Sequence, residues 1–161
     1  MITIRPAEES DAPLMVEWLL QPNVLEGFPL SDLREVEDAV RIWVSYRKFG
    51  SCLTALVDGI PCANAVLYLQ PYKKLAHQCL FAIIVDEKYR GQGVGRKLLE
   101  TLMQLAKETF HIDLLHLEVY EGNEIALNLY RKLGFVEYGK QRHFVKADGR
   151  YLTKIMMQKR L

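Results

Sequence analysis

Three glycines at alternate positions, Gly91, Gly93 and Gly95, restrict how this chain can fold more than any other feature. They follow an apolar run that ends at Val85 and precede a stretch with the periodicity of an amphipathic helix. Glycine adopts φ > 0 readily, so such a loop can curl and direct several backbone N–H groups at one point. The start of a helix adds free N–H groups and a positive dipole end. The order strand, glycine loop, helix therefore predicts an anion-binding loop, most often one for phosphate.

Two familiar phosphate-binding patterns do not fit this loop. The P-loop requires Lys-Ser/Thr after its last glycine, and the chain has none there. The dinucleotide fingerprint Gly-x-Gly-x-x-Gly, started at Gly91, needs a glycine where the chain has Arg96. The pattern that fits is Arg-x-x-Gly-x-Gly, with Arg90, Gly93 and Gly95 at its fixed positions.

Length and composition favour one globular domain. The 161 residues suffice to bury a core, and 50% hydrophobic with 25% charged residues is ordinary for a soluble protein. The net charge of +1 argues against a nucleic-acid partner. No apolar run approaches the ~18 residues of a membrane span, and the N-terminus lacks a signal-peptide pattern. We therefore expect a single domain over residues 1–161, located in the cytoplasm, without membrane or nucleic-acid partners.

The cysteines and histidines indicate neither a disulfide nor a metal site. Three cysteines, Cys52, Cys62 and Cys79, fit a reducing compartment. A two-residue Asp-Gly hairpin between the first two would place Ala55 opposite Cys62. It would place Cys52 opposite Ala65, so no disulfide is expected. The four histidines show no metal-ligand spacing, and no metal is expected.

The N-terminal part of the chain predicts one strand and two helices. Residues 2–5 alternate as a strand does, and the helix that follows stops at Pro22. Residues 23–29 are predicted to be a loop. Asp32 then caps a second helix that ends near Gly50.

Three strands and a helix come next. An Asp-Gly pair joins predicted strands over residues 52–57 and 61–69, since this pair suits a type I′ turn. Residues 78–85 are nearly all apolar, which predicts a central strand covered on both faces. The helix after the glycine loop carries an apolar stripe from Leu98 to Phe110.

The C-terminal part predicts a strand, a short helix and a hairpin. The strand over residues 113–120 places His116 and Glu118 on the same face. The short helix over residues 123–133 precedes two strands joined by a second Asp-Gly turn. The full order is strand, two helices, three strands, helix, strand, helix, two strands. This order predicts a mixed α/β sheet with helices on both faces.

A second motif gives the pattern a family resemblance. Residues 117–135 contain a strand followed by Asn-x-x-Ala, Leu-Tyr and Lys-x-Gly-Phe. Together with the Arg-x-x-Gly-x-Gly loop, this resembles the GNAT superfamily of acyl-CoA N-acyltransferases. The resemblance covers roughly residues 1–160, is strongest over 79–135 and is weak before residue 50. It implies a single-domain GNAT-like α/β fold, with a mixed, mostly antiparallel sheet of about seven strands flanked by about four helices.

The resemblance implies acetyl-CoA as cosubstrate. In the family, the fourth strand pairs with the pantetheine arm through its main chain, the glycine loop holds the pyrophosphate, an asparagine bonds the arm or nearby water, and a tyrosine lies near the thioester sulfur. Asn123 also fits a helix N-cap, and Arg90 also fits a solvated loop cation. The matching residues are Ile83, Ile84, Val85, Arg90, Gly91, Gln92, Gly93, Val94, Gly95, Arg96, Asn123 and Tyr130.

Acyl transfer from a thioester to an amine needs an acid and a route for a proton. Free alkyl amines are protonated at pH 7, so a base or a water chain must remove a proton before attack. The oxyanion needs hydrogen-bond donors, and the departing thiolate needs a proton. Tyr130 is the candidate general acid, with a core aromatic as the competing interpretation. No Cys or Ser lies in a recognisable nucleophile pattern, so direct transfer is expected.

Glu118 is the candidate base. Many family members carry a glutamate on the fourth strand, but residues 78–85 contain no carboxylate. Glu118 lies on the neighbouring strand, five residues before Asn123, and this spacing resembles the ribosomal-protein-alanine acetyltransferases. An ordinary salt bridge or a solvent-facing position is the structural alternative. A water chain, or a relay through His116 or His77, is the chemical one.

The acceptor is the least determined part of the prediction. In the family it is gripped by the loop between the first two helices and by the final hairpin. These segments supply Glu26, which suits a cationic amine, Phe28, and Arg142, which suits a carboxylate, while His116 lies near the candidate base.

The final hairpin resembles small-molecule and amino-acid acetyltransferases, whereas Glu118 is more typical of enzymes that act on protein N-termini. We hypothesise direct acetyl transfer to the primary amine of an amino acid, polyamine or amine-bearing antibiotic. A protein N-terminal acetyltransferase and a catalytically silent coenzyme A-binding module are the alternatives, and a homodimer is left open.

Overall fold

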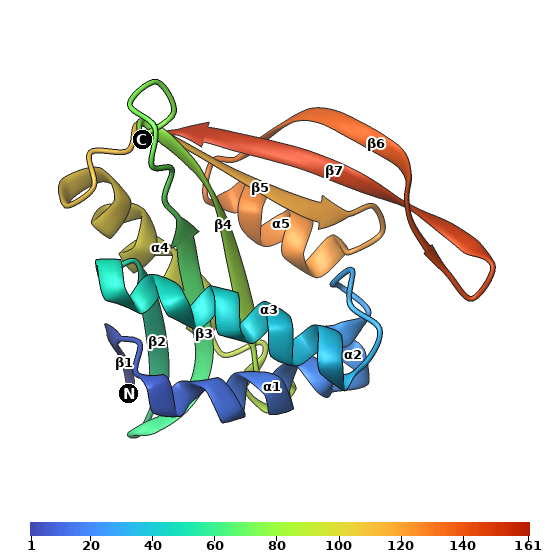
Figure 1. Ribbon diagram of the computed structural model, residues 1–161, viewed down its shortest axis with the longest axis horizontal. Helices are drawn as coiled ribbons and strands as arrows, with labels where there is room; N and C mark the ends of the chain where they lie inside the picture. The colour runs from blue at the N-terminus through green and yellow to red at the C-terminus, as the bar shows by residue number, and fades with distance from the viewer.

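The computed structural model describes all 161 residues and places every strand in one seven-stranded sheet, in the order β1-β2-β3-β4-β5-β7-β6 (Figure 1). The strands are β1 (Ile2–Pro6), β2 (Cys52–Val57), β3 (Ile60–Tyr68), β4 (Gln78–Val85), β5 (Leu114–Tyr120), β6 (Val136–Ala147) and β7 (Arg150–Arg160). The α-helices are α1 (Ala12–Leu20), α2 (Pro22–Leu25), α3 (Leu33–Ser45), α4 (Val94–Glu108) and α5 (Glu124–Lys132).

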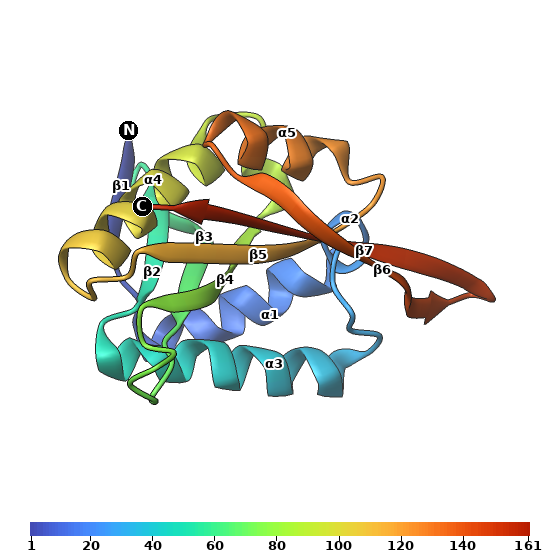
Figure 2. The ribbon, with the colours of Figure 1, turned by 90° about the horizontal axis from the view of Figure 1, so that it is seen from above.

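Helices cover both faces of the sheet and bury two separate apolar cores. Figure 2 shows α4 and α5 on one side and α1 and α3 on the other. The larger core lies under α4 and α5 and includes alternate residues of β5, while the smaller core lies under α1 and α3. The hairpin of β6 and β7 extends beyond the rest of the molecule (Figure 1). No helix has the length and apolar character needed to cross a membrane.

The strands β4 and β5 form the only parallel pair, and the pair is short. It begins with Gln78 beside Leu114 and ends with Leu80 beside His116. Beyond that point the two strands diverge, as Figure 1 shows, although β5 continues to pair with β7 along its whole length. The rest of β4 therefore has no strand beside it on this edge, and its main-chain groups are available to a ligand.

The predicted fold class and the order of the main elements are confirmed, but one segment differs. Residues 23–29 were predicted to be a loop, whereas the helical turn α2 begins at Pro22. Proline fixes φ near the helical value and lacks an N–H that the first turn would leave unpaired, so it can start a helix directly after ending another. The structure therefore has five α-helices rather than about four.

The predicted register of the first hairpin is wrong. A β-bulge just after Ala55 shifts the pairing by one residue. Cys52 therefore lies opposite Val66 instead of Ala65, and Ala55 does not face Cys62. All three cysteines are free, as predicted.

A buried polar network joins β1 and the start of α1 to β2 and β3. Arg5 donates two hydrogen bonds to the Asp11 carboxylate at 2.8 and 2.9 Å, and Thr54 donates a third at 2.7 Å. Asn64 extends the network by donating to Thr54 Oγ1 at 3.0 Å. Burial alone would raise the pKa of Asp11, which is 1% exposed, but its hydrogen bonds to Arg5, the Glu8 N–H and Thr54 hold the pKa below its usual value.

Replacing Asp11 with Asn should lower the free energy of unfolding at pH 7 by about 1–3 kcal/mol, because it removes the charged acceptor. The folded pKa of Asp11 lies below its unfolded value of about 3.9, so this stabilisation is present above that value and is lost as the pH falls through the folded pKa. Urea unfolding should show that the difference in unfolding free energy between the unmodified protein and Asp11→Asn is smaller at pH 3 than at pH 7. The half-exposed Asp38, which pairs with Arg41 at 2.9 Å, is the matched control, and Asp38→Asn should change stability by less than about 1 kcal/mol. Equal effects of the two substitutions would contradict the prediction.

Candidate active site

The glycine loop leads into α4 with its backbone arranged to bind an anion. Gly91 and Gly93 have φ values of 76° and 83°, in the left-handed region where a Cβ causes strain. The first N–H bond in the helix runs from Lys97 to the Gly93 carbonyl at 3.1 Å. The N–H groups of residues 93–96 therefore have no partner within the helix and lie at its positive end.

Gly95 has a different role from the other two glycines. It lies in the first turn of α4 and has no positive φ. A Cβ there would be 3.6 Å from Val85 at the end of β4 and 3.6 Å from Leu129 on α5. The start of α4 is thus packed closely against both the free edge of β4 and the helix that carries Tyr130.

A side-chain clamp fixes the loop that precedes the glycines. Gln21 donates to Asp86 Oδ1 at 2.9 Å and accepts from the Glu87 N–H at 3.0 Å. Arg90 donates to the Asn23 carbonyl at 3.3 Å. These bonds hold the end of β4 and the glycine loop against α2, so the glycine loop and the predicted acceptor segment are neighbours.

Other predicted cofactor residues fall into two groups. Arg96 and Gln92 have exposed side chains, and Arg96 forms an ion pair with Glu100 at 2.9 Å. Ile84 and Val94 are buried in the two cores. They can therefore contact a cofactor only through their main-chain atoms, while Ile83 and Val85 pack only partly buried on the side of α4 and α5.

Tyr130 lies where β4 leaves β5. Its ring packs edge-on against Phe81, the first β4 residue beyond the parallel pair, at 6.0 Å between ring centroids, and against Phe135 at 6.2 Å. The residue is 8% exposed, and burial raises the pKa of its hydroxyl to about 12. The hydroxyl is therefore protonated at neutral pH, and the packing fits both a core aromatic and a proton donor.

Glu118 and His116 lie on the opposite face of β5, toward α1 and α3. Glu118 Oε2 is 3.1 Å from the Lys154 ammonium, so the ion pair considered as a structural alternative does form. His116 Nε2 lies 2.6 Å from Gln78 Oε1, at the base of the divergence. Burial lowers the pKa of His116, and the nearby Glu118 only partly opposes this, so the imidazole is neutral at pH 7.

The predicted acceptor segment, residues 23–29, meets the turn between β5 and α5. Asn123 caps α5 by accepting from the Ala126 N–H at 3.4 Å, and a Cβ on Gly27 would lie 3.7 Å from its Nδ2. In the same segment Phe28 packs on Trp43 with ring centroids 6.3 Å apart, and Glu26 is exposed.

The predicted contribution of the final hairpin changes in detail. Arg142 is exposed within a bulge of β6 and forms no ion pair. Phe144, from the same bulge, instead packs over Lys154. Lys154 and Phe144 were missed because their place depends on strand register; the only local signal is the alternation of β7, which puts Lys154 on one face with Met156.

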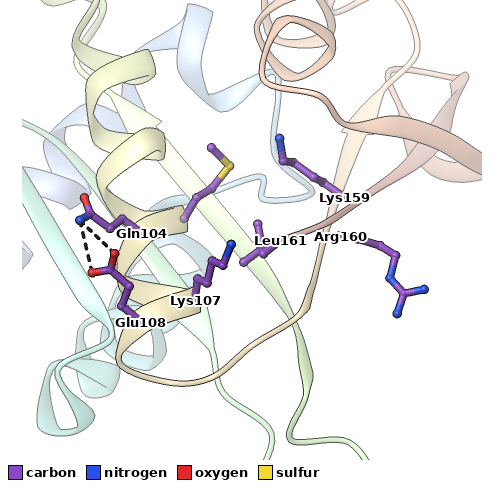
Figure 3. Close-up of a pocket in the computed structure, with 7 residues that line it drawn as sticks. Gln104, Lys107, Glu108, Lys159, Arg160 and Leu161 are labelled. Carbon is purple, nitrogen blue, oxygen red and sulfur yellow. Dashed lines mark hydrogen bonds between the residues drawn. The ribbon is translucent and has the colours of Figure 1, made fainter.

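Two cavities lie away from these residues. One of about 250 Å³ is lined by Phe49, Leu69, Gln70 and Pro71. The other, of about 460 Å³, lies at the far end of α4 from the glycine loop (Figure 3). In this cavity Lys159 donates a hydrogen bond to the Leu133 carbonyl at 2.7 Å, and Gln104 donates one to the Glu108 carboxylate. Its lining residues are Met103, Gln104, Lys107, Glu108, Lys159, Arg160 and Leu161.

Comparison with known proteins agrees with this geometry. The family model described as Acetyltransferase (GNAT) family matches residues 14–135. The chain belongs to this family. It is therefore an acyltransferase of the GNAT type, and the resemblance drawn from the two motifs is confirmed.

The GNAT relatives differ in their substrates and in the share of their own length that this chain matches. The L-amino acid N-acetyltransferase AaaT of Escherichia coli is 24% identical over 97% of this chain and 96% of the relative. An N-alpha-acetyltransferase of Sulfurisphaera tokodaii is 44% identical over 42% of this chain, and the match spans only 40% of that relative's length. The structure of yncA from Salmonella typhimurium, with its cofactor acetyl-CoA, has a TM-score of 0.83 and 21% identity, covering 99% of this chain and 94% of that one.

Replacing Gly91 with Ala should weaken acetyl-CoA binding about three- to tenfold, because a Cβ opposes the left-handed φ that orients the loop amides. Gly50 is the matched control, since its φ of 73° is close to the 76° of Gly91 and it lies outside the site. Both substitutions should cost about 1 kcal/mol of stability, and only Gly91→Ala should reduce affinity. Calorimetric titration and thermal unfolding measure the two effects. Equal affinities for the two variants would contradict the role of the loop.

Proposed function

We propose that this protein transfers the acetyl group of acetyl-CoA directly to the primary amine of a small molecule, such as an amino acid, a polyamine or an amine-bearing antibiotic. The observation that carries the proposal is the divergence of β4 and β5. It lies between free helix amides on one side and the Glu118 carboxylate on the other. Burial raises the pKa of Cys62 to about 11 and of Cys79 to about 12, which supports transfer without a thiolate nucleophile.

The residues present fit acetyl-CoA. The unpaired amides of residues 93–96 suit a pyrophosphate, and the free edge of β4 beyond Leu80 suits the amides of a pantetheine arm. When bound, acetyl-CoA supplies an acetyl group already activated as a thioester. Arg90 and Arg96 add positive charge beside the loop, and the clamp through Gln21 holds that loop in place.

The chain's own groups would handle the protons. Tyr130 Oη holds a proton at neutral pH, as a donor to a departing thiolate must. Glu118 is the proposed acceptor of the amine proton, and neutral His116 on the same face can relay it. Because the acid and the base lie on opposite faces of the sheet, the amine and the thioester would meet within the divergence.

Tyr130→Phe should reduce kcat about 100-fold or more, since general acid catalysis contributes at least that much, while acetyl-CoA affinity should change little. Initial-rate assays of thiol release measure kcat, and calorimetric titration measures the affinity for acetyl-CoA. Tyr68→Phe is the control, because Tyr68 packs edge-on against Tyr46 in the other core, on the opposite face of the sheet from Tyr130. A Tyr130→Phe variant with the turnover of the unmodified protein would remove Tyr130 from the acid role.

The proposed reaction is tested by a panel of amines with a thiol-release readout. Small-molecule amines should accelerate thiol release from acetyl-CoA well above its hydrolysis, whereas peptides that begin with alanine should not. Acceleration by the peptides alone would favour protein N-terminal acetylation, which the position of Glu118 and the partial match to an N-alpha-acetyltransferase support. Binding of acetyl-CoA without acceleration by any amine would favour a silent coenzyme A-binding module.

A further inference from the structure

Lys154 is a largely buried charge for which acetyl transfer itself has no use. It lies on β7 opposite Tyr120, and its side chain is 11% exposed, compared with 42% for Glu118. Its Nζ is 3.1 Å from Glu118 Oε2 and 4.1 Å from the centroid of the Phe144 ring. Burying an ammonium is unfavourable unless it is paired, so its place beside the proposed base requires an explanation.

The β6 bulge gives this ammonium an aromatic wall. The pairing of β6 with β7 shifts between Gln141, which lies opposite Lys154, and Val145. Bulges redirect side chains, and this one places the Phe144 ring over the ammonium, where a cation–π contact stabilises the charge. The contact with Glu118 engages one of the three N–H donors of the Lys154 ammonium, so the other two are available to a ligand.

Beside this ion pair lies a polar group that has no partner. The Tyr120 hydroxyl is buried and makes no hydrogen bond, and the Tyr120 ring lies 6.3 Å from that of Phe144. Burial, and then the charge of Glu118, raises the pKa of Tyr120 to about 12, so the hydroxyl is a donor at neutral pH. An unsatisfied buried hydroxyl indicates a site that a ligand or a water brought with it completes.

We propose that Lys154 binds the carboxylate of the acceptor while Glu118 faces its amine, so that the preferred acceptor is an α-amino acid. This inference rests on the proposed acetyl transfer. An α-amino acid carries adjacent opposite charges, and the Glu118–Lys154 pair presents adjacent opposite charges to match them. A polyamine would place a second cation against Lys154, and a protein N-terminus carries an amide where the amino acid has a carboxylate. Tyr120 completes the carboxylate subsite, and Phe144 forms its apolar wall.

The test compares L-amino acids with their amides and with the corresponding decarboxylated amines, with spermidine and an alanine peptide beside them. The unmodified protein should prefer the free acids at least about tenfold in kcat/KM, mainly through KM, because a charged partner is lost in the others. Lys154→Met keeps the length and the packing on Phe144 but removes the charge. It should reduce the preference to about threefold or less, because KM should rise more for the acids than for the amides. Lys154→Arg should retain the preference, and Tyr120→Phe should weaken it less than Lys154→Met does.

The outcomes separate this inference from the reaction on which it rests. Equal use of acids and amides by the unmodified protein would overturn the carboxylate subsite without any variant being needed. A Lys154→Met variant that loses acids and amides in the same proportion would show that Lys154 acts through the fold or through Glu118 and not on the carboxylate, and would also overturn the subsite. Preference for spermidine or for the peptide would overturn the subsite and leave acetyl transfer standing. If none of these amines stimulates thiol release from acetyl-CoA, acetyl transfer itself is overturned.

Discussion

The divergence of β4 and β5 is the constraint on which the rest of the structure depends. Two parallel strands that pair for only three residue pairs and then separate leave main-chain groups unpaired in the middle of a sheet. Such groups are unfavourable unless water or a ligand bonds them. The sheet tolerates the opening because β5 pairs fully with β7 and β4 pairs along β3, so each half is held from its outer side.

The site follows from what borders this opening. The end of β4 leads into the glycine loop, and Gly95, in the first turn of α4, lies close to both β4 and α5. On α5, Tyr130 packs against Phe81 at the point where the strands part. On the other face, Glu118 and Lys154 form an ion pair. One opening therefore has anion-binding amides at one end, a protonated phenol on one face and a pair of opposite charges on the other.

Local patterns predicted much of this, and long-range register accounts for most of what they missed. The glycine loop, the helical stripes and the Asp-Gly turns are local signals, and they located the elements and the amides of α4. The helical start at Pro22 was missed because a proline that ends one helix can also begin another. The bulge after Ala55 lies within a hairpin of consecutive strands, but the alternation of residues does not mark it. The meeting of Lys154 with Glu118 depends on how strands from distant parts of the chain align, which no local pattern contains. The roles given to Tyr130 and Glu118 stay predictions.

Hydrogen–deuterium exchange with and without acetyl-CoA tests the central claim most directly, since it reports backbone amides at the opening itself. Binding should slow exchange in residues 81–85 of β4 and 93–96 at the start of α4, where the structure leaves main-chain groups without a hydrogen-bond partner. Amides near the cavity lined by Met103 and Leu161 should be unaffected. Protection at that cavity, with no change at β4 and the start of α4, would contradict the account.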